Sequence, residues 1–133
     1  MADAVTSQTL IDGPNKAVMK FTNISDSTGE SAVTKVDVSA LSSSADGDTC
    51  TEVIIERIWW QCIGMKVQIL WDASSDVFCI ELGENQSGDH DYSHFGGITN
   101  NASSPTGDIN FTTVGASAND TYTVILEMRK KYG

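Results

Sequence analysis

The main concentration of side chains able to do chemistry lies at residues 89–94, in the run Asp-His-Asp-Tyr-Ser-His. Imidazole nitrogens and carboxylate oxygens both bind divalent metals, so this run is a candidate metal site. His90 and His94 would share a face only on a helix, and the glycines around them disfavour a helix. The favoured alternative is a polar loop whose aromatic residues Tyr92 and Phe95 dock on the body of the protein. We therefore expect no bound metal.

The rest of the sequence does not supply a catalytic site. It contains no G-x-S-x-G, phosphate-loop, G-x-G-x-x-G or H-E-x-x-H motif. A Ser-His-Asp or Cys-His site would need the one segment that holds both histidines, and nothing beside Ser93 and His94 indicates an orienting base. Cys50, Cys62 and Cys79 are odd in number and irregularly spaced, which predicts buried or partly buried thiols. We expect neither enzymatic activity nor a cofactor.

Net charge argues against two classes of partner. Eighteen acidic residues against eight basic ones give a net charge of −10, so most of the surface repels phosphate backbones and anionic lipid. We expect no nucleic-acid and no membrane partner. The basic cluster Arg129 to Lys131 is expected to be a solvated end, or else an anchor on an acidic neighbour. No stretch is apolar enough to span a membrane, and residues 1–5 do not resemble a signal peptide, so we expect a cytosolic protein.

The elements that carry these residues are predicted to be strands. Apolar runs rich in Val, Ile, Thr and aromatics recur between clusters of Gly, Ser, Asp and Asn. About eight strands are expected: Val5 to Ile11, Ala17 to Ile24, Val33 to Leu41, Thr51 to Ile63, Met65 to Trp71, Val77 to Leu82, Asp108 to Val114 and Thr121 to Met128. Gly64 is expected to join neighbouring antiparallel strands, and Gly83 to Gly107 to form one long loop. The fold class is therefore all-β, a single domain over residues 1–133, either an antiparallel sandwich or a barrel, with a jelly roll possible.

The segment Thr51 to Ile63 carries the strongest physical signal. Strict alternation along a strand gives it two apolar faces. One face has Ile54, Ile58, Trp60 and Cys62, and the other has Val53, Ile55, Trp59 and Ile63. A tryptophan buries about 150–250 Å², so the indole that points away from the core needs a cover. Either the loop from Gly83 to Gly107 folds over it, or it lies in a subunit interface.

Several stretches from one end of the chain to the other resemble a family of virion structural proteins of tailed bacteriophages, which are about as long as this chain. They are Ala4 to Pro14, Lys20 to Asp26 with Gly29 to Ser31, Lys35 to Leu41, Leu70 to Ala73, Phe95 to Ile98, and Thr106 to Asp108 with Phe111 to Gly115. The resemblance implies a non-enzymatic particle component in many copies. Its first implication is a decoration or cement protein that bridges and stabilises major capsid subunits, and its second is a neck or tail subunit.

A decoration role gives a set of expected contacts and a location. The candidate interface residues are Trp59, Trp60, Tyr92, Phe95, Val5 and Leu10. The expected partners are the major capsid protein, copies of this chain in a homo-oligomer, or both, and the expected location is the virion, assembled in the bacterial host cytoplasm. The terminal strand from Val5 is expected to pair with a neighbouring edge strand. The alternative from another class is a carbohydrate-binding or adhesin module, with Trp59 or Trp60 and Tyr92 as the stacking platform.

Overall fold

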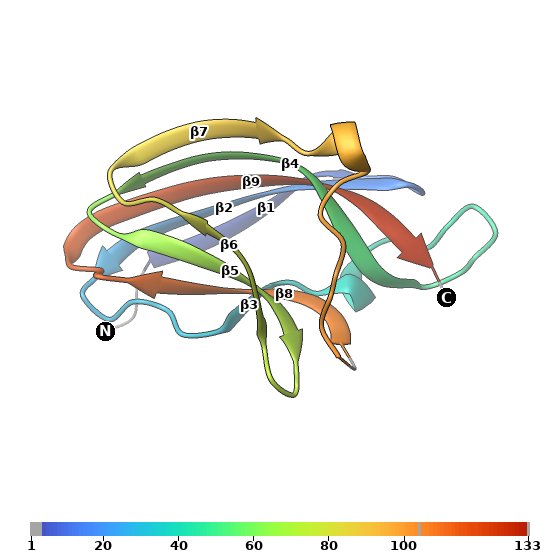
Figure 1. Ribbon diagram of the computed structural model, residues 1–133, viewed down its shortest axis with the longest axis horizontal. Coiled ribbons are helices and arrows are strands. Elements are labelled where there is room, and N and C mark those ends of the chain that lie inside the picture. Colours follow the sequence, from blue (N-terminus) through green and yellow to red (C-terminus); the bar gives the residue numbers. More distant parts are fainter. Residues whose placement is uncertain (1–3, 104, 133) are drawn as a thin grey trace.

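Two antiparallel sheets packed face to face form the computed structural model, which describes residues 4–103 and 105–132 (Figure 1). The larger sheet has the order β1-β2-β9-β4-β7, and the smaller has the order β3-β8-β5-β6. The bounds are β1 Ala4–Asp12, β2 Lys16–Asp26, β3 Val33–Val36, β4 Cys50–Ile63, β5 Lys66–Ala73, β6 Val77–Leu82, β7 Gln86–Asp91, β8 Pro105–Val114 and β9 Ala118–Tyr132. The all-β antiparallel prediction is confirmed, with nine strands among the described residues rather than eight.

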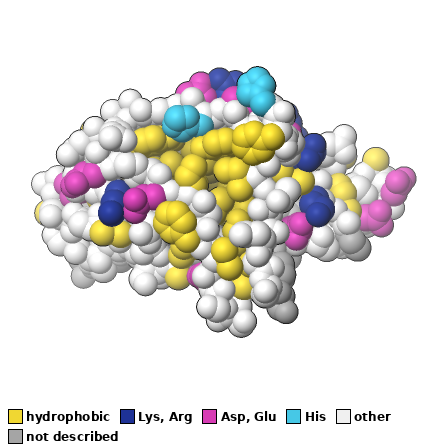
Figure 2. Space-filling view, in the orientation of Figure 1, with side chains coloured by type: hydrophobic (Ala, Val, Ile, Leu, Met, Phe, Trp, Pro, Cys, Tyr) yellow, Lys and Arg dark blue, Asp and Glu magenta, His cyan; other side chains and the backbone are white. Residues whose placement is uncertain are grey.

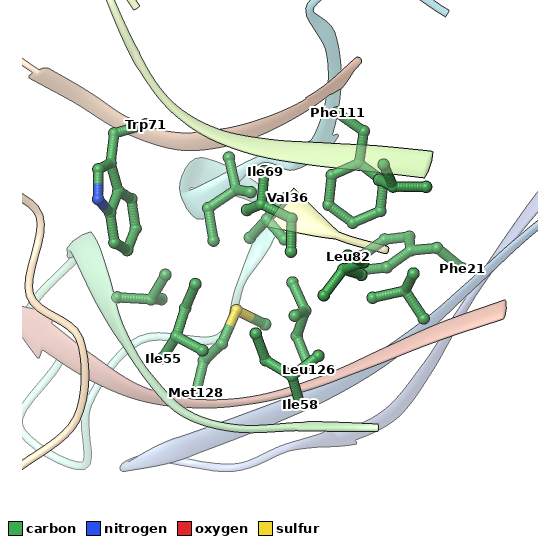
Figure 3. Close-up of a cluster of buried hydrophobic side chains, with 14 of the residues drawn as sticks. Phe21, Val36, Ile55, Ile58, Ile69, Trp71, Leu82, Phe111, Leu126 and Met128 are labelled. Carbon is green, nitrogen blue, oxygen red and sulfur yellow. The ribbon is translucent and has the colours of Figure 1, made fainter. Parts of the chain in front are cut away.

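The core lies between the sheets and follows the alternation of the sequence (Figure 3). In β9, Tyr122, Val124, Leu126 and Met128 are buried, and the residues between them are partly exposed. Phe111 of the smaller sheet packs edge-on against Phe21 of the larger sheet, with ring centroids 5.3 Å apart. Each such side chain stabilises the fold by roughly 1.5–3 kcal/mol when it leaves water.

The predicted long loop contains a strand that the sequence did not reveal. Residues 86–91 form β7 and pair with β4 at the edge of the larger sheet, and a 3₁₀ turn, η2 (Ser93–Phe95), follows. The run Gln-Ser-Gly-Asp-His-Asp has low intrinsic strand propensity, so the pairing with β4 decides its conformation. Gly88 helps, because a Cβ there would lie only 3.1 Å from the Trp60 indole. The absence of a side chain at Gly88 lets this strand close against the ring.

The predicted strand from Val33 to Leu41 is only half a strand. After β3 ends at Val36, residues Val38–Ala40 form a 3₁₀ turn, η1. The Asp37 carboxylate accepts a hydrogen bond from the Ser39 N–H at 3.0 Å, and the Asp108 carboxylate accepts one from the Val38 N–H at 2.9 Å. These two carboxylates satisfy backbone donors that a longer β3 would have used in the sheet.

Gly64 links the two sheets and not two neighbouring strands, so the predicted hairpin at this position is wrong. β4 belongs to the larger sheet and β5 to the smaller, and the chain turns between them with Gly64 at φ +80°. A Cβ at Gly64 would overlap the Asp120 carboxylate, so only glycine fits this corner without a shift.

Gly64→Ala is expected to lower the free energy of unfolding by about 2–4 kcal/mol, because it adds a steric overlap to the cost of a left-handed backbone. Gly47→Ala is the matched control: Gly47 has φ +89°, and no atom lies within 4 Å of the added Cβ. The control is expected to cost only about 1–2 kcal/mol, the conformational part alone. Urea unfolding of both variants measures the difference, and equal losses would show that Asp120 moves aside freely.

Candidate functional site

A β-bulge in β4 decides which of its side chains face the core. The register against β9 shifts between Ile55 and Arg57. Before the shift, the odd-numbered residues Val53 and Ile55 point into the core. After it, the even-numbered residues Ile58 and Cys62 point into the core, so the bulge exchanges the two faces of the strand. The prediction of two uninterrupted apolar faces is therefore wrong. The adjacent charged residues Glu56 and Arg57 break the apolar run at that point and could have indicated the bulge from the sequence.

Trp59 lies on the outer face of the larger sheet and is partly exposed. The Arg57 guanidinium covers one side of its ring, 4.7 Å from the ring centroid. Arg57 also donates to both Asp89 carboxylate oxygens, at 2.8 and 2.6 Å, and these hydrogen bonds hold the pKa of Asp89 below its usual value. A shallow groove beside Trp59 is lined also by Trp60, Gln61, Ser87, Gly88, Asp89, Thr123 and Ile125. The apolar surface of the outer face at this point therefore consists of the Trp59 indole and the neighbouring Ile125.

Trp60 lies on the opposite face and begins a row of rings that runs out of the core. Ring centroids are 6.4 Å apart from Trp60 to His90, 6.2 Å from His90 to Tyr92 and 6.1 Å from Tyr92 to Phe95. Trp60 and Tyr92 pack against the core, whereas Phe95 is 70% exposed. The predicted docking of Tyr92 is confirmed, but that of Phe95 is wrong, because η2 ends in the left-handed Gly96 and leaves Phe95 outside.

Beside the end of this row, Phe95 and residues of the smaller sheet form one lateral apolar surface. Phe78 of β6 is 52% exposed and lines a groove with Phe95, Cys79, Ile98 and Trp71, to which Thr99 and Asn101 add polar groups. Figure 2 shows hydrophobic side chains gathered across this side of the molecule, with the two histidines at the upper margin. Phe78 was not among the predicted contacts. The continuous apolar run Val-Phe-Cys-Ile that opens β6 could have indicated an exposed apolar residue, since side chains alternate along a strand and part of such a run must point outward.

The segment after β7 covers part of β4, but not the outward indole that the first sequence alternative expected it to cover. Ile98 exchanges two backbone hydrogen bonds with Ile55, of 3.1 and 2.8 Å. A Cβ at Gly97 would come within 2.6 Å of the Ile54 side chain, so this backbone lies directly on Ile54. Ile54 is buried for that reason, although it points away from the core. Trp59 is not enclosed by this segment.

The candidate metal ligands are held apart by the strand. Asp89 is paired with Arg57 on the outer face, and His90 lies on the other face within the ring row. Asp91 accepts hydrogen bonds from the Ser93 N–H and hydroxyl at 2.8 and 2.6 Å, which lower its pKa. Across residues 4–103 and 105–132, no three His, Cys, Asp or Glu side chains gather as a metal site would need.

The cysteine prediction is confirmed. Cys50 and Cys62 are buried, Cys79 is partly buried, and all three are free thiols. Burial raises the pKa of Cys62 to about 11 and that of Cys79 to about 12. These thiols therefore stay protonated near neutral pH and are poor nucleophiles.

The other predicted contact residues, Val5 and Leu10, lie on β1 at the opposite edge of the larger sheet. They are 45% and 46% exposed. Among the described strands, β1 is hydrogen-bonded to β2 alone, and its second edge is open. The structure thus places the six candidate residues on three separate surfaces: the outer face with Trp59, the lateral surface with Trp60, Tyr92 and Phe95, and the β1 edge. Pairing of that edge with a neighbour stays a prediction.

The two sheets define the class of the protein as an all-β sandwich. Compared with known proteins, the chain matches no family model, no curated sequence and no solved structure. None of the described residues form a helix long and apolar enough to cross a membrane.

Proposed function

We propose that this protein is a non-enzymatic structural subunit of a tailed-phage virion, a decoration protein that bridges major capsid subunits. The supporting observation is the lateral apolar surface, where Phe95, at the end of a ring row anchored in the core, is 70% exposed and Phe78, which lines the same groove, is 52% exposed. Large aromatic side chains that are backed by a rigid framework and exposed in the free protein are typical anchors of protein interfaces.

The placement of this surface supports a role in bridging. It spans both sheets, with Tyr92 and Phe95 following β7 of the larger sheet and Phe78 in β6 of the smaller. A partner bound there contacts a rigid body on both layers, and the acidic remainder of the chain keeps the free subunit soluble. The virion itself enters the proposal through the sequence resemblance, and a neck or tail position is its variant.

The geometry disfavours the carbohydrate-binding alternative. Trp59 lies beside Arg57 on the outer face, whereas Tyr92 stacks on His90 and packs against the core, so the two rings do not form one stacking platform. Trp60 shares the row with Tyr92, but its indole is packed on the core and faces the backbone of Gly88. Trp59 alone remains, and Arg57 already occupies one side of its ring.

The test is binding to capsids assembled from the major capsid protein of the phage that encodes this chain. Wild-type protein is expected to sediment with the capsids in hundreds of copies. The double variant Phe78→Ser and Phe95→Ser is expected to bind at least about tenfold more weakly, since anchor residues contribute about 2 kcal/mol or more each.

Ile63→Ser is the matched control, because Ile63 is 50% exposed but lies away from the lateral surface. It is expected to bind like the wild type. No sedimentation of the wild type, or equal binding by the double variant, would overturn the decoration role. A few tens of copies confined to one vertex would indicate the neck or tail.

A further inference from the structure

Within residues 4–103 and 105–132, β1 pairs with another strand along one side only. Its ladder with β2 runs from Ala4 opposite Ile24 to Asp12 opposite Ala17. Residues 4–11 are exposed without exception, on both faces of the strand. The smaller sheet approaches β1 only at a shallow hollow that Val5, Thr6 and Ser7 line together with residues 33–35 of β3. Besides the ladder, a hydrogen bond between the Thr6 and Thr22 hydroxyls and the contacts of Asp12 with Lys130 and Ser42 hold β1 in place.

The free edge of β1 is interrupted by a bulge between Thr9 and Ile11, but over Ala4 to Thr9 it lacks the charges and proline that normally keep sheet edges apart. Exposed edges are usually short or carry charges or proline. Among the other edge strands, β7 has Asp89, His90 and Asp91, β6 has Glu81, and β3 is only four residues long. By contrast, β1 reads Ala-Val-Thr-Ser-Gln-Thr-Leu-Ile before Asp12, without charge or proline. It is a long, neutral edge of largely β-forming residues.

We infer that β1 pairs antiparallel with β1 of a second copy of this chain. Two copies with a net charge of −10 each repel one another, so close approach costs least where both surfaces are neutral. The uncharged run of β1 is such a surface. The neighbouring strand β2 carries the positive charges of Lys16 and Lys20, which reduce the repulsion there. Pairing by a two-fold axis joins the two five-stranded sheets into one continuous sheet.

The pairing also covers apolar side chains that the monomer leaves in water. With the axis near Ser7, Ala4 and Val5 of one strand lie alongside Leu10 and Thr9 of the other. Cross-strand neighbours at this spacing pack against each other, so Val5 and Leu10 lose exposed surface in both copies. This association needs no capsid and uses an edge remote in the sheet order from β7, so it goes beyond the proposed function.

A charge exchange at Ser7 tests the pairing in the purified full-length chain. Wild type is expected to sediment as a dimer at about 100 µM. Ser7→Glu and Ser7→Lys, each alone, place like charges across the axis and are expected to weaken the dimer at least about tenfold. A one-to-one mixture of the two variants places opposite charges there and is expected to restore it.

The control Ser43→Glu puts the same charge on an exposed loop and is expected to leave the dimer intact. Restoration in the mixture separates an interface effect from simple loss of β1, because unfolded strands would not recover. A monomeric wild type, unchanged Ser7 variants, or a mixture that stays monomeric would overturn the inference. Capsid decoration by a monomeric wild type would overturn the pairing and leave the proposed function standing.

Discussion

Glu30→Ala is expected to lower the free energy of unfolding by about 3–5 kcal/mol, the cost of removing one partner from a buried ion pair. The Glu30 carboxylate pairs with the Lys35 ammonium, and the two side chains are 5% and 8% exposed. It also accepts hydrogen bonds from the Tyr122 hydroxyl at 2.6 Å and the Asn23 amide at 3.1 Å. Alanine would leave the Lys35 charge buried and remove the acceptor from both other groups. Urea unfolding followed by tryptophan fluorescence measures the loss.

Two further variants identify the charge as the cause. Glu30→Gln keeps the length and an acceptor oxygen but removes the charge, so a smaller loss of about 1–3 kcal/mol is expected. The double variant Glu30→Ala with Lys35→Met leaves no buried ion and is expected to recover part of the stability. If the double variant is less stable than Glu30→Ala alone, the ammonium of Lys35 is not the source of the penalty.

Lys130→Met is expected to cost about 2–4 kcal/mol, because the ammonium of Lys130 holds three segments together. Its side chain is 0% exposed, and its Nζ donates to the Asp12 carboxylate, to the Gly13 carbonyl at 2.7 Å and to the Ser42 carbonyl at 3.0 Å. The control is the neighbouring Lys131→Met, since the Lys131 side chain is 51% exposed and its ammonium pairs with Glu52 across 3.0 Å. An exposed pair of this kind contributes about 0–1 kcal/mol.

The contribution of Asp12 to this contact should depend on pH. Burial raises the pKa of Asp12, but hydrogen bonds from Lys130 and Ser42 outweigh it and leave the pKa below its usual value. The folded pKa is therefore lower than the unfolded one, so the stabilisation is present above about pH 4 and is lost as the pH falls below it. The stability gap between wild type and Lys130→Met should narrow from pH 6 to pH 3. A constant gap would show that the two carbonyls alone hold the ammonium.

The expectation of a solvated basic tail was wrong for Lys130, and the reason can be read in the sequence. Every second side chain of β9 points into the core, from Tyr122 through Val124 and Leu126 to Met128. Lys130 is the next residue in this alternation and therefore also points inward. Charge suggested an exposed residue, whereas position in the strand placed it inside. The buried site is possible because Asp12 and two carbonyls surround the ammonium, and these come from segments more than 80 residues away in the chain.

Strands were predictable from the sequence where one face is buried and the other is exposed to solvent. β2, β5 and β9 follow that pattern, because each pairs on both sides within a sheet that covers one face of the core. β7 was not predictable, because its conformation depends on β4 beside it and on the room that Gly88 leaves for Trp60. Local composition cannot show either condition, which exists only once the sheet has formed.

The sequence allowed the candidate contact residues to be named, but it did not show which of them lie on the same surface of the protein. Alternation correctly placed Trp59 and Trp60 on opposite faces, yet the bulge after Ile55 determined which of the two faces the core. The position of Phe95 depends on where η2 ends, at Gly96, and the exposure of Phe78 depends on the edge position of β6. These outcomes follow from turn geometry and sheet order, which hydrophobic periodicity does not encode.

The central position of β9 constrains how the chain folds during synthesis. β9 follows the other described strands in the sequence, yet it separates β2 from β4 in the larger sheet. Until residues 118–132 leave the ribosome, β2 and β4 each present an unsatisfied edge to other nascent chains. Because pairing between distant segments slows folding, we expect this chain to fold on the order of milliseconds to seconds and to need protection from aggregation until β9 is synthesised.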